Sequence, residues 1–213
     1  MPTQAAYPVA FQESHAEGRS LLDLRHQAES CERCDLYRNA TQTVFGEGDA
    51  QAKVMLVGEQ PGDKEDIAGR PFVGPAGTIL DECLAAAGVD RSLCYVTNTV
   101  KHFKFEQRGK RRLHAKPNAG EIQRCAWWLG GEIDVLKPEL IVALGATALQ
   151  SLLGRSIGLK KERGRILDSP SGLPVLITIH PSYLLRIRDR AEAQLNKRLF
   201  IEDLKQISTV VSV

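Results

Sequence analysis

Four short apolar segments constrain the fold more than any other feature of this chain. They read KVMLV (53–57), LCYVTN (93–98), LIVAL (140–144) and VLITI (175–179), and a polar or Gly/Pro-rich stretch follows each of them. Apolar runs of this length between turn signals are typical of buried strands. Between them, apolar residues recur at helical spacing over residues 76–88, 120–136 and 145–154. Because strands that alternate with helices favour a parallel sheet covered on both faces, the sequence predicts an α/β protein, a single-domain three-layer αβα fold with a central four-stranded parallel sheet.

Length and cysteine content define the expected class of protein. The 213 residues suit one domain with a sizeable core, so we expect a single domain over residues 1–213, with about the first 15 loosely attached. No apolar run reaches the roughly 18 to 20 residues that cross a bilayer, and the N-terminus does not resemble a secretion signal, which predicts a cytoplasmic protein. The five cysteines are an odd number, which in a reducing compartment favours metal ligation or core packing over disulfides. Cys83, on an apolar helix face, and Cys94, in a strand, are expected to be core thiols.

Positive charge is concentrated in two segments, although the formal net charge is only +2. Residues 101–116 hold seven Lys or Arg residues and one acidic residue, and residues 155–165 hold five and one. Local positive charge of this kind is expected where a protein contacts phosphates. A solvated basic loop explains the same charge equally well, so charge alone leaves nucleic-acid binding open.

Three polar segments follow strands of the predicted sheet at their carboxyl ends. The first strand leads into GEQPGDKEDIAGRPFVGPAG (58–77), the second ends at Asn98 before the basic segment, and the fourth leads into HPSYLLR (180–186). Ligands of open parallel sheets bind beyond this edge, so we expect the three segments to form one site. The Gly/Pro-rich segment lacks the GxxxxGK[ST] spacing and is therefore not a P-loop.

The motifs in these segments carry a family resemblance. GEQPG at 58–62, Phe72 within RPFVGPAG, VTN at 96–98 and HPSYLL at 180–185 resemble, in this order, the motifs of the uracil-DNA glycosylase superfamily in its iron–sulfur-containing family 4 branch. The resemblance extends from about Cys31 to Leu204. The insertion KRRLH (110–114) is similar to the histidine-bearing loop of the UdgX-type proteins, which remove uracil and remain covalently joined to the DNA. Leu113 stands where that loop commonly has another aliphatic residue.

The resemblance implies a pocket that reads a flipped uracil. A base inside a duplex is out of reach, so such an enzyme acts on single-stranded DNA or flips the nucleotide out. Asn98 is expected to pair with uracil O4 and N3–H, and Phe72 to stack on the base, although core packing would also explain an aromatic residue there. His180 is expected to donate to uracil O2, and the backbone N–H of Gln60 to share in stabilising the leaving base. A lone histidine at a strand end also fits a structural role.

His114 is the predicted nucleophile. A neutral imidazole is nucleophilic, and crowding by Lys110, Arg111 and Arg112 is expected to disfavour its protonated form. The resemblance thus implies a bond between the His114 ring and C1′ of the abasic sugar, which makes the enzyme single-turnover. Glu59 is the candidate carboxylate that orients a water or accepts a proton, although a loop or helix-cap contact would also explain it. Without the resemblance, His114 would be expected to lie in solvent or to contact phosphate.

Basic side chains of the insertion and polar groups after the fourth strand are predicted to hold the DNA backbone in a sequence-independent, salt-sensitive way. The predicted contacts are Lys110, Arg111, Arg112, Ser182 and Arg186. Tyr183, Leu184 and Leu185 fit a wedge that fills the gap left by a flipped nucleotide, and the two leucines fit a helical core equally well. The expected partner is uracil-containing DNA, single-stranded with duplex DNA left open, and the protein is expected to be a monomer.

Three cysteines and a histidine are the candidate metal ligands. Cys31 and Cys34 make a CxxC, and the resemblance places the remaining two ligands at Cys125 and at His102, where the family has cysteine. This set implies a structural 4Fe-4S cluster, and three Cys with one His is also a tetrahedral zinc set. The insertion that carries His114 lies between His102 and Cys125, so a bound cluster is expected to limit the volume that this histidine explores.

Together these features predict a DNA-repair glycosylase that excises uracil from DNA and becomes linked through His114 to C1′ of the abasic sugar. Two alternatives stay open. One is an ordinary turnover family 4 uracil-DNA glycosylase in which His114 contacts phosphate. The other is a non-catalytic, metal-stabilised DNA-binding module.

Overall fold

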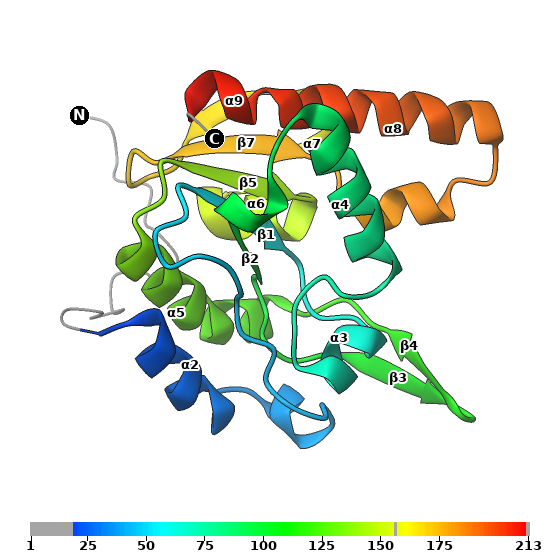
Figure 1. Ribbon diagram of the computed structural model, residues 1–213. Coiled ribbons are helices and arrows are strands. Elements are labelled where there is room, and N and C mark those ends of the chain that lie inside the picture. Colours follow the sequence, from blue (N-terminus) through cyan, green and yellow to red (C-terminus); the bar gives the residue numbers. More distant parts are fainter. Residues whose placement is uncertain (1–18, 156, 212–213) are drawn as a thin grey trace.

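A five-stranded sheet forms the centre of the molecule in the computed structural model, which describes residues 19–155 and 157–211 (Figure 1). Its order is β2 (Cys94–Asn98), β1 (Val54–Gly58), β5 (Leu140–Leu144), β7 (Pro174–Thr178) and β6 (Ile166–Asp168). The first four strands are parallel and coincide with the four apolar segments of the sequence. The predicted fold class is confirmed, and the predicted strand number is corrected, because β6 adds an antiparallel edge to β7.

Helices cover both faces of this sheet, because successive strand residues point to opposite sides. Val54 and Leu56 of β1 lie in one buried cluster with α4 (Pro75–Ala87) and α8 (Arg190–Lys205). Met55 and Val57 lie in a second cluster with α5 (Ala119–Leu136) and α6 (Ala146–Leu153). α2 (Leu21–Glu29) packs beside α5, outside this second layer (Figure 1). Each parallel strand is therefore buried on both faces, which explains its continuous apolar sequence.

Shorter elements connect these layers. They are η1 (Asp35–Arg38), α3 (Asp63–Ala68), η2 (Arg91–Leu93), α7 (Leu159–Glu162), η3 (Pro181–Arg186) and α9 (Ile207–Val210). Within the described residues, no helix combines the length and the apolar character that a membrane span requires. The N-terminal segment of about 15 residues that is expected to be loosely attached lies outside the described residues.

The basic insertion is a β-hairpin and not the loop that its sequence predicts. β3 (Phe105–Arg108) pairs antiparallel with β4 (Arg111–His114), and Phe105 lies opposite His114. Gly109 forms the turn with a φ of 59°, a left-handed conformation that glycine adopts without strain. Figure 1 shows this hairpin projecting from the body of the molecule next to α3. We call residues 105–114 the histidine hairpin.

The local positive charge of residues 101–116 is smaller than the sequence predicts, because part of it is neutralised internally. Lys101 pairs with Glu132 in the core, and Lys104 pairs with Glu121 on α5. Arg112 pairs with two aspartates of α3. The cations of this segment that form no ion pair with another described residue are Arg108, Lys110 and Arg111 near the hairpin tip and Lys116 after the hairpin.

Candidate active site

The carboxyl ends of β1, β2 and β7 bring the predicted residues together. Gly58 at the end of β1 pairs with Asn98 at the end of β2. Glu59 follows directly, and its carbonyl oxygen accepts a hydrogen bond of 2.9 Å from the backbone N–H of Val100. His180 follows β7 at the same edge. The sheet topology thus produces the single site that the sequence predicts.

Phe72, Asn98 and His180 lie close together at the end of β1, and we use the name base pocket for these three residues, which the sequence predicts to bind the base. A Cβ on Gly58 would collide with the Asn98 side chain and would lie 2.7 Å from Cζ of Phe72, so only glycine fits there. Phe72 adopts a φ of 55°, and its ring lies 5.8 Å from that of His180 between centroids. Asn98 is buried, and its Oδ1 has no hydrogen-bond partner among the described residues. A buried acceptor without a donor is unusual, and a ligand N–H would satisfy it.

Ser182 determines which nitrogen of His180 carries the proton. Nδ1 of His180 lies 3.1 Å from the backbone N of Ser182 and 2.8 Å from its Oγ. Because a backbone N–H only donates, Nδ1 is the acceptor, and a neutral ring therefore carries its hydrogen on Nε2. Burial lowers the pKa of His180 to about 4, with smaller contributions from Arg186 and His114, so the ring is neutral at pH 7. The Ser182 side chain, predicted to contact DNA, instead faces His180.

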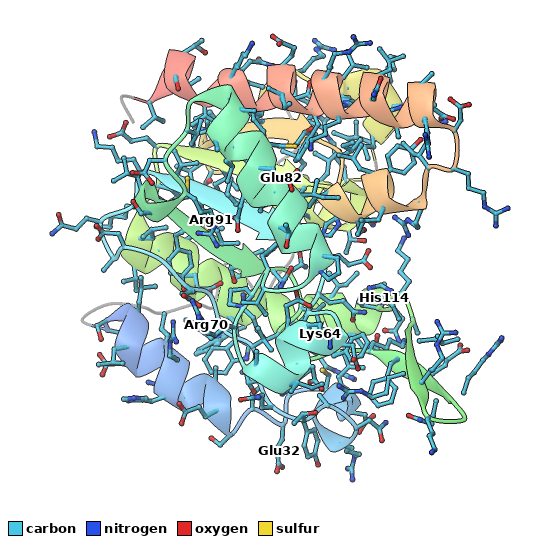
Figure 2. The ribbon with its side chains drawn as sticks, turned by 45° about the vertical axis from the view of Figure 1, so that its right-hand side comes forward. Glu32, Lys64, Arg70, Glu82, Arg91 and His114 are labelled. Atoms are coloured by element: carbon cyan, nitrogen blue, oxygen red, sulfur yellow. The ribbon has the colours of Figure 1, made fainter. Side chains whose placement is uncertain are left out.

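His114 faces Glu59. Its Nε2 lies 3.5 Å from Oε1 of Glu59, while Oε2 of Glu59 accepts a short hydrogen bond from Oγ1 of Thr147. Figure 2 shows His114 at the end of β4 that joins the body of the molecule. Burial lowers the pKa of His114, Glu59 opposes that shift, and Arg186 reinforces it. The direction is the predicted one, but its causes are burial and Arg186 and not the cations 110–112. Lys110 and Arg111 lie exposed at the hairpin tip, and Arg112 pairs with Asp63 and Asp66.

Gln60 fastens both ends of the histidine hairpin. Its Oε1 accepts from the backbone N–H of Lys104 at 3.1 Å, and its Nε2 donates to the carbonyl oxygens of Lys104 at 3.1 Å and Ala115 at 3.0 Å. These three hydrogen bonds occupy the side-chain amide. Gln60 was predicted to act on the base through its backbone N–H, whereas its side chain positions the hairpin.

Arg112, which the sequence predicts to contact DNA, forms ion pairs with two aspartates of α3 in the structure. Its Nε lies 2.6 Å from Oδ1 of Asp63, and its Nη1 lies 2.5 Å from Oδ2 of the buried Asp66. The guanidinium carbon also lies 5.4 Å from the ring centroid of Phe103 and 5.1 Å from that of Phe105. Cations at this distance from aromatic faces are attracted to them. Arg112 therefore attaches the hairpin to α3.

The other predicted DNA contacts are available to solvent. Lys110 and Arg111 lie exposed at the hairpin tip, and Arg186 is exposed at the end of η3. Within residues 19–155 and 157–211, none of the three forms an ion pair at contact distance. Leu185 is 52% exposed and Leu184 is buried, so of the two leucines only Leu185 can contact DNA as a wedge.

Comparison with known proteins assigns the family. Residues 45–205 match the model of the uracil DNA glycosylase superfamily. The chain belongs to the uracil-DNA glycosylase superfamily. It is 37% identical to a type-4 uracil-DNA glycosylase of Thermotoga maritima over 186 residues, which cover 87% of this chain and 91% of the relative. Type-4 uracil-DNA glycosylases of Pyrobaculum aerophilum and Archaeoglobus fulgidus are 39% and 30% identical, over 78% and 84% of this chain and 85% and 91% of their own length.

A buried ion pair behind the base pocket was missed by the sequence analysis. Nζ of Lys101 lies 2.6 Å from Oε2 of Glu132 and donates to the carbonyl oxygen of Asn98 at 2.7 Å. Glu132 also accepts from the hydroxyls of Tyr95 and Thr97, both at 3.0 Å. Both charged side chains are fully buried. In the sequence, the sign of this pair was Glu132 within the apolar part of α5, but nothing there identified Lys101 as its partner.

The candidate metal ligands lie in one buried cluster on the α2 side of the molecule. Cys31, Cys34 and Cys125 are all buried there. The indole N–H of Trp128 donates to the sulfur of Cys31, and the backbone N–H of Lys101 donates to that of Cys125, both at 3.1 Å. N–H donors of this kind stabilise thiolates that hold a cluster. The donor chemistry therefore fits an iron–sulfur or zinc site.

In the structure, the four candidate ligands do not come together as a metal-binding group. His102 is buried, and its Nε2 lies 2.9 Å from Oγ1 of Thr43. Among the described residues, no three Cys, His, Asp or Glu side chains form a group that could hold a metal ion. The ring of His102 would have to leave Thr43 to ligate a metal through Nε2. Cys83 and Cys94 are buried core thiols, as predicted.

Proposed function

We propose that this chain excises uracil from DNA and is then joined covalently, through His114, to C1′ of the abasic sugar. Membership of the superfamily and the type-4 relatives make it a DNA glycosylase that removes uracil. One observation carries the covalent step. A histidine that remains half exposed faces Glu59 at 3.5 Å, on a hairpin that three hydrogen bonds of Gln60 fix to the edge of the base pocket.

Excision separates charge, and the base pocket has the groups to stabilise it. As the bond between C1′ and N1 breaks, its electron pair leaves with uracil and the sugar becomes a cation. The Nε2–H of neutral His180 is suited to donate to uracil O2. The unpaired Oδ1 of Asn98 is suited to accept from N3–H, and its amide nitrogen to donate to O4. Phe72 provides the stacking face.

Capture uses the lone pair of the His114 ring. The nitrogen that carries no hydrogen forms a bond to C1′, and both electrons come from that nitrogen. The ring is then an imidazolium, which loses the proton of its other nitrogen to Glu59 or to water. Because the pKa of His114 is lowered, the free ring is neutral at pH 7 and its lone pair is available. An N-alkylated imidazole is a poor leaving group, so the adduct is the end product.

DNA binding in this proposal uses Lys110, Arg111 and Arg186, which lie exposed around the site. Cations that contact phosphates release counterions, so affinity should fall with salt and depend little on sequence. Single-stranded DNA is the simplest substrate, because its uracil is already accessible.

A 4Fe-4S cluster held by Cys31, Cys34, His102 and Cys125 completes the proposal. The three buried thiols and their two N–H donors support it, and zinc is the alternative that the same donors allow. A bound cluster would join the segment after α2, through Cys31 and Cys34, to Cys125 on α5, and excision of uracil needs no electron from it. Broad visible absorption with iron and sulfide in the purified protein would support the cluster. A colourless protein with stoichiometric zinc would support the alternative.

The deciding experiment uses a labelled single-stranded DNA with one uracil, analysed on a denaturing gel. The wild-type chain is expected to give a uracil-dependent shifted band that survives heat and SDS. His114→Ala should lose the band and still release uracil, because the base pocket is intact. His26→Ala, an exposed histidine on α2, is the matched control and should behave as wild type.

Two other outcomes have clear meanings. Free uracil with abasic DNA and no shifted band would identify a turnover glycosylase, in which His114 contacts phosphate. Neither uracil release nor a band would contradict the excision chemistry for this substrate, and reversible salt-sensitive binding would then favour a non-catalytic module.

A further inference from the structure

Thr147 lies behind the carboxylate that faces His114. It is 4% exposed and is the second residue of α6, the helix that follows β5. Gly145 makes the turn into this helix with a φ of 96°, and a Cβ there would lie 3.1 Å from Cβ of His180. Because the turn passes this close to His180, the start of α6 and therefore Thr147 are fixed relative to the base pocket.

The two oxygens of Glu59 have separate partners. Oε2 accepts the hydroxyl hydrogen of Thr147, and Oε1 lies 3.5 Å from Nε2 of His114. The backbone of Glu59 is already held, because its carbonyl oxygen accepts from Val100. The remaining freedom of this residue is rotation of its side chain, and the hydroxyl of Thr147 restricts that rotation. The first turn of a helix also favours a negative charge, which suits an ionised carboxylate at this place.

We propose that Thr147 is a positioning residue for the capture step, because it holds Glu59 with Oε1 directed at His114. The inference rests on the proposed function for the capture step, whereas the contact between Thr147 and Glu59 does not. In the step itself, the unprotonated ring nitrogen of His114 forms the bond to C1′ with its own electron pair. The proton on the other ring nitrogen then passes to Glu59, and uracil leaves with the electrons of the broken C1′–N1 bond.

The first test compares Thr147→Val with Thr147→Ser. Valine has nearly the same shape and lacks the hydroxyl, whereas serine keeps it. Single-turnover adduct formation should be about tenfold slower in Thr147→Val, since small misplacements of reacting groups cost this much or more. Thr147→Ser should remain close to wild type. Uracil release, measured in the same reactions, should fall less than the adduct does, because the base pocket is unchanged.

The second test is an NMR titration of the His114 ring, which is assigned with His114→Ala. The charged groups that act on this ring are Glu59, Arg186 and, when protonated, His180. Glu59→Gln should lower the pKa of His114, because the carboxylate raises it. Thr147→Val should shift it in the same direction, and Thr147→Ser should not.

These measurements separate the two proposals. If the wild-type chain releases uracil without an adduct, the proposed function fails, and the titration still decides whether Thr147 directs Glu59 at His114. A His114 pKa that is the same in wild type, Glu59→Gln and Thr147→Val overturns the inference. Adduct formation at the wild-type rate in Thr147→Val overturns it as well.

Discussion

The base pocket and the histidine hairpin are built in different ways. The base pocket lies at the ends of buried parallel strands, where Asn98 is almost inaccessible and the Lys101–Glu132 pair supports it from behind. The histidine hairpin projects into solvent and is attached through the polar side chains of Gln60 and Arg112. In the proposed function, base recognition would thus depend on the core of the fold, whereas capture would depend on a few surface contacts. The two activities should therefore be separable by substitution.

The largest expected effect is on the buried ion pair. Lys101→Met leaves Glu132 charged and without its cation in the core, which should lower the free energy of unfolding by roughly 3 to 5 kcal/mol. The matched control is Lys53→Met, which removes a half-exposed pair with Glu139 and should cost about 0 to 1 kcal/mol. Denaturant unfolding measures both. Equal losses of unfolding free energy in the two variants would contradict the stabilising role that we assign to the Lys101–Glu132 pair behind Asn98.

Asn98→Ala should reduce uracil excision by roughly 10²-fold to 10³-fold, as expected when a group that stabilises the leaving base is removed. The exposed Asn39→Ala is the control and should retain full activity. Single-turnover release of uracil is the measurement. Any residual excision in Asn98→Ala should still end in an adduct, and abasic DNA without adduct would show that pocket and hairpin are not independent.

The pH dependence of stability should reveal the buried state of His180. Its pKa in the folded chain is about 4, below the ordinary 6.5, so the unfolded chain binds a proton that the folded chain rejects between these values. This contribution is full above about pH 6.5 and is lost as the pH falls towards 4. Between pH 7 and 4, wild type should lose about 2 to 3 kcal/mol more stability than His180→Gln.

The matching comparison for the hairpin is His114→Gln. Its difference from wild type over the same pH range should be smaller, because half of the His114 side chain is exposed. Chemical denaturation at several pH values measures both differences. Equal differences would mean that the two histidines are buried alike.

The smallest expected effects distinguish two cations of the hairpin. Arg112→Ala removes the attachment to α3 and should slow adduct formation about tenfold while excision changes little. Lys110→Ala at the exposed tip should leave adduct formation unchanged at low salt and reduce the salt slope of DNA binding by about 1. Gel kinetics and salt-titrated binding measure these quantities. If Arg112→Ala instead reduced the salt slope and left adduct formation unchanged, Arg112 would be a phosphate contact.

The central sheet was predictable because its strands are buried on both faces and their sequences are continuously apolar. The histidine hairpin was not, since most of its residues are exposed and its strands have no apolar periodicity. Only Gly109 between two polar stretches was a local signal for a turn. Strand β6 was missed because its three residues at the sheet edge are too few to show a strand pattern.

For the site residues, the sequence predicted which side chains lie at the same edge of the sheet better than it predicted which groups they contact. Glu59, Asn98 and His180 were predicted to lie at one edge of the sheet because the carboxyl ends of parallel strands meet there, and the structure places them at that edge. The ion pairs of Arg112 were not predicted, because a sequence shows a cation and not the aspartates that neutralise it. Thr147 and Lys101 were missed since each acts through a partner far along the chain, 88 residues away for Thr147 and 31 for Lys101.

The ends of the histidine hairpin lie side by side, because the backbone N–H of Ala115 donates to the carbonyl oxygen of Lys104 at 3.0 Å. The two strands between these positions pair with each other and with no strand of the central sheet. In the proposed function, one local insertion of this kind would be enough to add covalent capture of the product to a uracil-DNA glycosylase. The same junction would then be a place to graft other reactive side chains next to the end of β1.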